Sequence, residues 1–342
     1  MMPPLVSVIV PVFNREAMIG ATVASLGRQT LDDFEIIVVD DGSTDASAEI
    51  AERAGGKRVR VIGHGHNRGI PAARNTGLEA ARGRYIAWLD SDDLARPKRL
   101  ERQAGFLARY QEIALVGSAS GRIGADGQQR RGTRVPFVAH ETLVPALLFN
   151  SPFQQSSIMG VARTLKDFEY RVEFPVCEDL DMFIRIARKH RLANLKDVLI
   201  DRRLHDGQIG TNESALVRDR KRVLFREPLE MLGLEISDAD LDRHITLGTL
   251  KRRPQSREFI GWAEAWLGSI RTGNQHTGVY NSRGLALVCA RAWVRACYLG
   301  LHGDQPRSVA RVMLTSSLMM GFANSDAIEW LAQLLTPLLS LS

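Results

Sequence analysis

The stretch YIAWLDSDD at residues 85–93 joins five apolar residues directly to an acidic turn. A short run that is apolar at consecutive positions is typical of a strand buried on both faces, as in a parallel sheet. In open α/β sheets, ligands bind outside the carboxyl ends of such strands. We therefore expect a buried strand at 85–89 and, at its end, a ligand-binding edge that carries Asp90, Asp92 and Asp93.

The first 120 residues repeat this pattern of a short apolar strand followed by an amphipathic helix. Further strands are expected at Val6–Val10, Phe34–Val39, Val59–Ile62 and Ile113–Val116, and helices should begin near residues 15, 45, 71 and 97. The alternation predicts an α/β fold with a Rossmann-like, mostly parallel central sheet. The next segment, 117–135, is rich in glycine and arginine and predicts a hairpin or a mobile loop.

The layout changes in the second half of the chain. A strand at 154–159, an amphipathic helix at 179–189 and a last strand at 193–200 should complete the sheet near residue 203. From about residue 211 the pattern is wholly helical. The helices expected there span 215–232, 238–248, 256–271, 284–300, 306–321 and 326–340. The sequence thus predicts an α/β domain at 1–210 and an α-helical C-terminal region at 211–342.

The composition is that of a folded, soluble protein. Among 342 residues, 44% are hydrophobic and 25% are charged, which excludes wholesale disorder. A net charge of +6 suits polyanionic partners such as nucleotide diphosphates or anionic lipid surfaces. The basic residues do not alternate with aromatic residues in a patch, so we expect no nucleic-acid partner.

The cysteines and the apolar stretches bear on location. Cys177, Cys289 and Cys297 form no Cys-x-x-Cys pair, so the sequence predicts neither a zinc site nor a disulfide framework. No charged segment followed by an apolar stretch precedes the first strand, so we expect no signal peptide. The longest apolar stretches, at 284–301 and 309–323, are interrupted by arginines and fall short of a transmembrane helix. We expect a cytoplasmic protein, with peripheral contact with the inner face of an anionic membrane as the alternative.

The acidic turn at 90–93 has two possible roles. Three close carboxylates repel one another, and a hard divalent cation such as Mg²⁺ or Mn²⁺ would neutralise them with oxygen ligands and substrate phosphates. Alternatively, the aspartates cap the helix that is expected to begin near residue 97. A second acidic turn, VDDGSTD at 39–45, ends an earlier strand. There Asp41 could accept a hydrogen bond from a nucleobase N–H, or the segment could be only a strand-to-helix turn.

Two further segments should lie in the same layer. The first strand ends in PVFNR at 11–15, where Phe13 could lie against a nucleobase and Arg15 near a phosphate; alternatively, Phe13 belongs to the core. The segment NRGIPAARN at 67–75 opens a helix with arginines that suit phosphate or base contacts, among them Arg74. Alternatively, these arginines are only solvated.

Four motifs in this order resemble the family 2 glycosyltransferases, which have the GT-A fold. The motifs are SVIVPVFN at 7–14, VDDGSTD at 39–45, the segment 67–77 and the segment 85–93. The resemblance implies an inverting enzyme that depends on a nucleotide-sugar. It also implies that Phe13 and Asp41 hold the base, that Arg74 lies beside the nucleotide, and that the Asp92-Asp93 pair contacts ribose and metal.

The resemblance extends to two segments on the acceptor side. CEDLD at 177–181 is similar to the family's Glu-Asp motif, which implies Asp179 as the general base and Glu178 as an orienting residue. A helix N-terminus would keep Asp179 ionised, although an N-cap role is the alternative. RRLHDGQ at 202–208 is similar to the family's Tyr-Arg-x-His segment, but Asp201 or Arg202 stands where tyrosine is usual. His205 could therefore contact metal or phosphate, or be only structural.

The resemblance completes the set of expected roles. It implies a nucleotide-sugar half at 1–117, an acceptor half at 118–210, Mn²⁺ or Mg²⁺ as cofactor, and transfer from a UDP-sugar to a glycan or lipid-linked acceptor in surface polysaccharide biosynthesis. The alternatives are a nucleotidyltransferase that acts on sugar phosphates and a non-catalytic assembly protein that binds nucleotide-sugars. The expected substrate contacts are Pro11, Phe13, Asn14, Arg15, Asp41, Arg74, Asp90, Asp92, Glu178 and His205, the metal ligands are Asp92 and Asp93, and the catalytic residue is Asp179.

Overall fold

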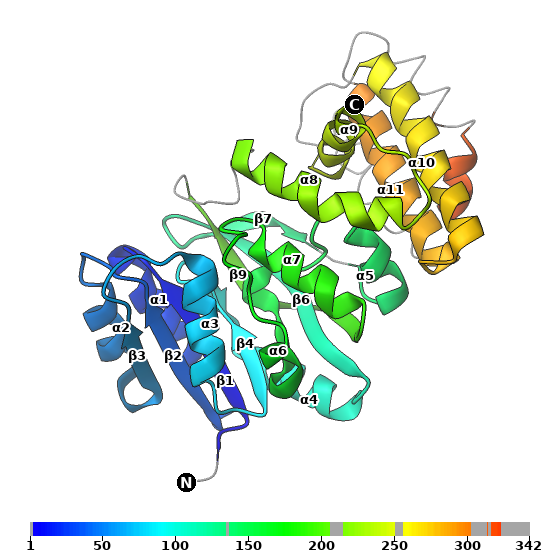
Figure 1. The fold of residues 1–342 in the computed structure, drawn as a ribbon. Coiled ribbons are helices and arrows are strands. Elements are labelled where there is room, and N and C mark those ends of the chain that lie inside the picture. Colours follow the sequence, from blue (N-terminus) through cyan, green and yellow to red (C-terminus); the bar gives the residue numbers. More distant parts are fainter. Residues whose placement is uncertain are drawn as a thin grey trace. The chain divides into compact units, whose positions relative to one another are not determined.

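The structure, a computed structural model, describes residues 3–134, 137–205, 215–249, 256–301, 313 and 316–322. The chain divides into two compact units (Figure 1). The first comprises Met1–His140 and Ser151–Val217 and contains the sheet. The second comprises Glu141–Asn150 and Arg218–Ser342 and is helical in its described part.

The sheet of the first unit has nine strands in the order β3-β2-β1-β4-β8-β6-β9-β5, with β7 paired to β6. Strands β3, β2, β1 and β4 are parallel, and β8 is antiparallel to both β4 and β6, so β6 and β9 run in the same direction as β1. This confirms a mostly parallel α/β sheet. The strands are β1 Val6–Val12, β2 Phe34–Asp40, β3 Val59–Gly63, β4 Tyr85–Trp88, β5 Leu94–Ala95, β6 Ile113–Gly124, β7 Gln129–Arg134, β8 Met159–Val161 and β9 Arg191–Leu204.

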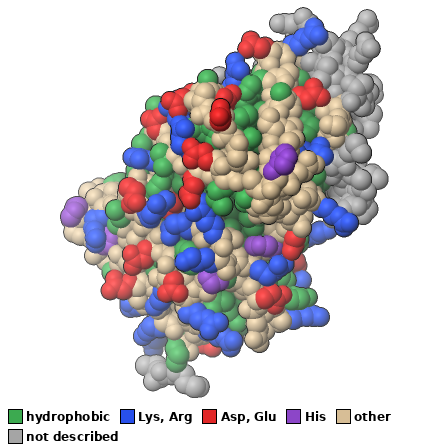
Figure 2. Space-filling view, turned by 45° about the vertical axis from the view of Figure 1, so that its right-hand side comes forward, with side chains coloured by type: hydrophobic (Ala, Val, Ile, Leu, Met, Phe, Trp, Pro, Cys, Tyr) green, Lys and Arg blue, Asp and Glu red, His purple; other side chains and the backbone are tan. Residues whose placement is uncertain are grey.

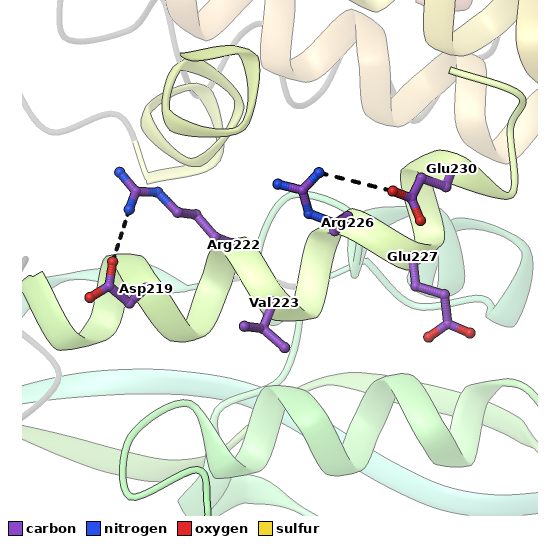
Figure 3. A pocket seen from close by; sticks show the side chains of 6 residues that line it. All are labelled: Asp219, Arg222, Val223, Arg226, Glu227 and Glu230. Atoms are coloured by element: carbon purple, nitrogen blue, oxygen red, sulfur yellow. Dashed lines mark hydrogen bonds and ion pairs between the residues drawn. The ribbon is translucent and has the colours of Figure 1, made fainter. Parts of the chain in front are cut away.

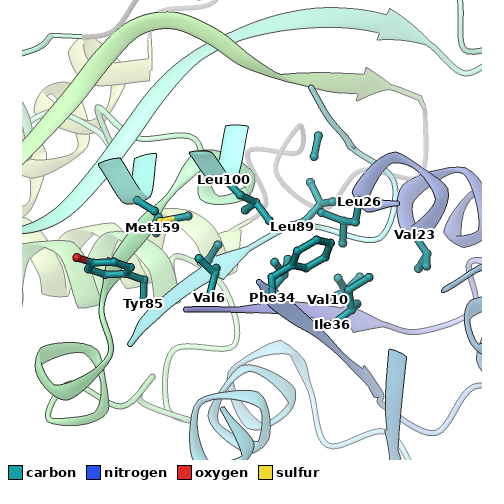
Figure 4. Packing of buried hydrophobic residues seen from close by; sticks show 14 of the residues in the cluster. Val6, Val10, Val23, Leu26, Phe34, Ile36, Tyr85, Leu89, Leu100 and Met159 are labelled. Carbon is teal, nitrogen blue, oxygen red and sulfur yellow. The ribbon is translucent and has the colours of Figure 1, made fainter. Parts of the chain in front are cut away.

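Helices connect the strands and cover the sheet (Figure 1). Alternate residues of the buried strand β1 point to opposite faces, as the pleat of a strand requires. Val6, Val8 and Val10 join the hydrophobic cluster shown in Figure 4, while Ile9 lies against Gly77 on the other face. The helices of this unit are α1 Glu16–Leu26, α2 Ser47–Gly55, α3 Ile70–Ala80, α4 Arg99–Arg109, α6 Ala162–Lys166 and α7 Glu178–Ala187.

Three expectations about the sheet were wrong in detail. β6 does not end at Val116 but runs on to Gly124, because β9 pairs with it over this whole length. The segment expected as a strand at 154–159 is instead the 3₁₀ turn η2 Gln155–Ser157, followed by β8. The strand β3 is not buried on both faces, since it forms the edge of the sheet and its side chains are half-buried or exposed.

The second unit is built from long helices. α10 continues through residues 272–275, where the sequence predicted its end, because Gly273 lets the helix pack closely against the carbonyl of Leu232. The helices expected at 306–321 and 326–340 lie outside the described residues, apart from residues 313 and 316 and the turn η4 Ser317–Phe322. Of the described helices, none is long and apolar enough to cross a membrane. The helices are α5 His140–Ala146, α8 Ala215–Glu230, α9 Asp238–Thr249, α10 Arg257–Thr277 and α11 Ser282–Gly300.

Candidate functional site

The carboxyl ends of the parallel strands bring several predicted site residues to one edge of the sheet. β1 pairs in parallel with β2 and with β4, so the residues that follow these three strands lie at the same edge. Pro11 is buried within β1, whereas Phe13 just beyond it is 40% exposed. A large exposed aromatic side chain at this edge can stack on a flat ligand.

The turn after β1 is held by the turn after β2. Asn14 has a left-handed backbone conformation with φ 49°, which asparagine tolerates better than most residues. Its amide donates to Ser43 Oγ at 3.0 Å, and its side-chain oxygen accepts from the Thr44 amide at 2.9 Å. The Arg15 amide donates to Ser47 Oγ at 2.8 Å. Asn14 therefore has a structural role in shaping this edge.

Asp41 is buried and holds the loop before α3. Its carboxylate accepts from the amides of Arg68 at 2.9 Å and Gly69 at 2.8 Å. The ring of His64 contacts the same carboxylate through Nδ1 at 2.7 Å and reaches Thr76 Oγ1 through Nε2 at 3.0 Å. Sequence reasoning missed His64, because no motif marks it and only the end of β3 brings it to Asp41.

Arg74 lies in the interior and not at the surface. It is 4% exposed, and its guanidinium forms ion pairs with Glu178 and, at 3.2 Å, with Asp90. It also stacks on the ring of Tyr170, 5.3 Å from the centroid. Burial alone would lower the pKa of Arg74, but the two carboxylates outweigh it and raise the pKa. Arg74 thus ties the end of β4 to the start of α7.

The first turn of α7 carries two carboxylates in different environments. Glu178 is buried, and this burial raises its pKa to about 7 although Arg74 opposes the shift. Asp179 is half-buried, and its Oδ1 accepts from the Leu180 amide at 2.7 Å. The cap position before the helix is Cys177, with φ 61°, so Asp179 is the second residue of the helix. Among the residues that the structure describes, no group forms a hydrogen bond or ion pair with its second carboxylate oxygen, which leaves that oxygen suited to accept a proton.

The acidic turn after β4 presents Asp92 outward and Asp93 inward. Asp92 Oδ2 lies 2.9 Å from His205 Nε2, and both side chains are partly accessible. Asp93 is 2% exposed and accepts from the Arg203 amide at 2.9 Å. Burial raises the pKa of Asp93 to about 8, and the neighbouring carboxylates of Asp92 and Asp90 add to the shift. The Arg203 side chain also donates to the Asp92 carbonyl at 2.8 Å and so supports the turn.

The donor atoms of this turn fit a divalent cation that is shared with a substrate. The carboxylate of Asp92 suits Mn²⁺ or Mg²⁺. The imidazole of His205 is a nitrogen ligand, which a transition metal such as Mn²⁺ can bind in addition. In the part of the chain that the structure describes, no group of three or more His, Cys, Asp or Glu residues forms a metal cage. Sites of this kind take one or two protein ligands and complete the shell with substrate phosphates and water. The residues present therefore fit such a cation.

The second unit carries a groove along α8, shown in Figure 3. It has a volume of about 380 Å³ and is lined by Asp219, Arg222, Val223, Arg226, Glu227 and Glu230. Its charges are already paired, Arg222 with Asp219 at 2.9 Å and Arg226 with Glu230 at 4.0 Å. None of the predicted site residues lines it.

The charges of the surface are mixed. On the face shown in Figure 2, Lys and Arg side chains are interspersed with Asp and Glu side chains. The net charge of +6 is therefore not gathered into one basic surface there. Specific binding must come from local arrangements of side chains.

Comparison with known proteins gives consistent relatives. The model of the family "Glycosyl transferase family 2" matches residues 7–167. EpsE of Bacillus subtilis strain 168, named as a glycosyltransferase, is 30% identical over 243 residues, which cover 69% of this chain and 85% of that protein. An uncharacterized glycosyltransferase of Haemophilus influenzae is 29% identical, with 68% and 77% covered. The hyaluronan synthase of Pasteurella multocida is 28% identical, and the match covers 69% of this chain but 24% of that longer protein.

Solved structures show a similar fold. Residues 1–349 of TarS from S. aureus, in a complex with UDP-GlcNAc, superpose with a TM-score of 0.56 at 20% identity, and the match covers 91% of each chain. The same protein in complex with UDP gives a TM-score of 0.54 at 22% identity. This likeness confirms the expected GT-A fold.

Proposed function

Because this chain belongs to glycosyl transferase family 2, we propose that it transfers a sugar, with inversion, from a nucleoside-diphosphate donor to a glycan or lipid-linked acceptor. UDP is the proposed nucleotide. The observation that carries the proposal is that Arg74 forms ion pairs with both Asp90 and Glu178. This contact joins the acidic turn after β4 to the start of α7 within one edge of the sheet. The acidic turn, which could hold the donor, thereby lies close to Asp179, which could accept a proton.

The donor side of the proposal rests on the exposure of Phe13 and on carboxylate oxygens that can accept a further hydrogen bond or bind a cation. Phe13 is exposed enough to stack on the base. Asp41 Oδ1 is held by His64 and the Arg68 amide, whereas Oδ2 accepts only from the Gly69 amide among the described residues and would accept from a base N–H. Asp92 and His205 would hold Mn²⁺ or Mg²⁺ together with the diphosphate. The cation, when bound, offsets the negative charge that develops on the departing diphosphate. Asp93, being buried and bound by Arg203, would support the turn and contact the cation less directly than Asp92.

The acceptor side rests on Asp179. In an inverting displacement, the acceptor hydroxyl must lose its proton as its oxygen attacks the anomeric carbon, on the face opposite the leaving diphosphate. We assign this proton to the Asp179 carboxylate, which lies in the first turn of α7, where the helix dipole favours negative charge. Glu178 is held by Arg74 beneath it and would orient this turn.

The names of relatives favour a polysaccharide product. The relatives include a hyaluronan synthase and, from Escherichia coli, a chondroitin synthase, which is 28% identical over 235 residues and of which this chain covers 34%. We therefore extend the proposal to the biosynthesis of a surface polysaccharide, by a cytoplasmic enzyme in peripheral contact with the membrane. A nucleotidyltransferase would release pyrophosphate, whereas the proposed reaction releases a nucleoside diphosphate, so the product separates the two activities.

Asp179→Asn tests the proposal. With a panel of UDP-sugars and GDP-mannose in the presence of Mn²⁺, thermal shift identifies the donor, and release of nucleoside diphosphate with acceptor oligosaccharides measures transfer. We expect Asp179→Asn to abolish transfer and to leave donor binding within about twofold. Asp197→Asn, which changes an exposed carboxylate paired with Arg102, is the matched control and should keep full activity. Full transfer by the Asp179 variant would overturn the assignment.

A further inference from the structure

Three arginines on neighbouring strands form a row across the sheet. In the register of the strands, Arg122 of β6 lies opposite Arg130 of β7 on one side and opposite Arg202 of β9 on the other. Directly paired residues of adjacent strands share one face of the sheet, and the strands are about 4.8 Å apart. The row therefore presents three guanidinium groups across a span of about 10 Å.

The charges of this row are incompletely neutralised. Arg130 pairs with Asp126 at 2.7 Å. Within the residues that the structure describes, the side chains of Arg122 and Arg202 form no hydrogen bond or ion pair. Like charges directly opposite one another destabilise a sheet. The pairing of the strands therefore holds the positive charges of Arg122 and Arg202 close together in the absence of a ligand.

The backbone gives the central arginine room. Gly132, with φ 103°, follows Arg130 on β7, and a Cβ at this position would lie 3.4 Å from the Arg122 guanidinium. Arg122 and Arg130 are exposed and Arg202 is half-buried, so the row is open to solvent. An extended ligand can thus reach the guanidinium groups without a change in the fold.

The row lies on the acceptor side and not in the donor site. Arg203, whose side chain holds the Asp92 carbonyl, points to one face of β9, so Arg202 points to the other. Further along the same hairpin, Arg134 donates to the Ser151 carbonyl at 2.7 Å. The neighbouring Phe153 packs on Phe183 of α7, with ring centroids 4.9 Å apart. The hairpin of β6 and β7 is thus adjacent to the segment that supports α7.

We propose that Arg130, Arg122 and Arg202 form a binding track for an acceptor glycan that carries repeated negative charges. Planar guanidinium groups bind the oxygens of phosphate and carboxylate groups in a bidentate manner. The negative charges of an anionic glycan are groups of one of these two kinds. A track of this length would hold an acceptor chain by charges away from the reacting hydroxyl, while Asp179 faces the hydroxyl itself. This inference rests on the proposed transferase function and names its substrate class.

Arg122→Gln and Arg131→Gln make a matched pair for the test. Both arginines are exposed, both lie in the same hairpin, and both variants lose one positive charge. Arg131, however, is not paired with any arginine of the row, because the register of β7 against β6 shifts between Arg130 and Arg134. Binding of fluorescein-labelled polyphosphate, polygalacturonate and neutral dextran is measured by anisotropy at 50 and 200 mM NaCl. The first two probes separate phosphate from carboxylate recognition.

We expect the unaltered chain to bind at least one polyanion and not dextran, more weakly at the higher salt concentration. Arg122→Gln should weaken that binding about tenfold, Arg122→Gln/Arg202→Gln further, and Arg131→Gln less than about twofold. Thermal unfolding of the Arg122 variant should not begin at a lower temperature, since a repulsion is removed. Equal weakening by the two single variants, equal binding of dextran, or no binding of either polyanion would overturn the proposal. Nucleoside diphosphate release by the unaltered chain, measured separately, reports on the proposed transferase function.

Discussion

The buried contact of Arg74 makes the sharpest prediction about the first unit. Arg74→Met keeps most of the volume of the side chain but leaves the carboxylates of Glu178 and Asp90 without their partner. Breaking a buried ion pair by removal of one member costs about 3–5 kcal/mol, because a charge stays buried and uncompensated. For a unit of about 200 residues, this corresponds to a fall of about 6–20 °C in the midpoint of thermal unfolding.

The control is an arginine that forms a similar ion pair at the surface. Arg102 pairs with Asp197 at 3.0 Å, and the side chains are 54% and 39% exposed. Surface pairs of this kind contribute about 0–1 kcal/mol, since water screens them. Arg102→Met should therefore change the midpoint by at most a few degrees. If Arg74→Met lost no more stability than Arg102→Met in urea and thermal unfolding, the reasoning about the buried contact would be refuted.

The pH dependence gives a second readout on the same contact. Burial raises the pKa of Glu178 to about 7 in the folded chain, above the value of about 4.3 for an unfolded glutamate. Between these values the folded state binds more protons than the unfolded state, so the free energy of unfolding falls as pH rises through this window. Arg74 lowers this pKa, so its removal raises the pKa further and extends the window upward. Arg74→Met should thus lose more stability at pH 8 than at pH 6, and Glu178→Gln in the same chain should restore part of the loss at pH 8.

Three further predictions concern other parts of the molecule. Burial lowers the pKa of His244 in the second unit to about 4, so between about pH 6.5 and 4 the unfolded state binds one proton more than the folded state. The contribution of His244 to the free energy of unfolding should therefore fall by about 2 kcal/mol from pH 7.5 to 5, which urea titrations at both pH values would measure. Gly284→Ala should lower stability by about 1–3 kcal/mol, because a Cβ there collides with the backbone of α5, whereas Gly261→Ala, in open space within a helix, should raise it by about 0.5–1 kcal/mol in the same assay. EDTA should stop the release of nucleoside diphosphate, and added Mn²⁺ should restore it. His205→Ala should need at least about tenfold more Mn²⁺ for half-maximal release, and an unchanged requirement would remove His205 from the proposed metal ligands.

Local pattern predicted much of the first unit. The runs of consecutive apolar residues at β1, β2 and β4, and the acidic turns after β2 and β4, are properties of neighbouring residues and could be identified from the sequence. The edge at which the turns of Asp41 and Asp90 meet follows from parallel pairing. The length of β6 did not follow, because its second half is rich in glycine and serine and is a strand through its pairing with β9 and β7.

The environment of the site residues was harder to predict than their place. Arg74 and Glu178 are 104 residues apart, and nothing in the neighbourhood of either shows that they meet in the interior. The same holds for His64 and Asp41, which are 23 residues apart on neighbouring strand ends. A sequence motif identifies the residue type that a position requires, but burial and partner depend on the packing of segments distant in the chain.

Arg202 and Arg203 show that neighbouring residues of the same type can have different environments. They are adjacent and chemically alike, yet Arg203 is 5% exposed and holds the turn of Asp92 and Asp93, while Arg202 belongs to the open row. The pleat of β9 separates them, since a shift of the register by one residue would exchange the two faces. The buried side chains of the strand fix that register, so the core of the sheet decides which arginine supports the acidic turn and which one is left to meet a ligand. The arginine at position 202 adds the charge that completes the row with Arg122.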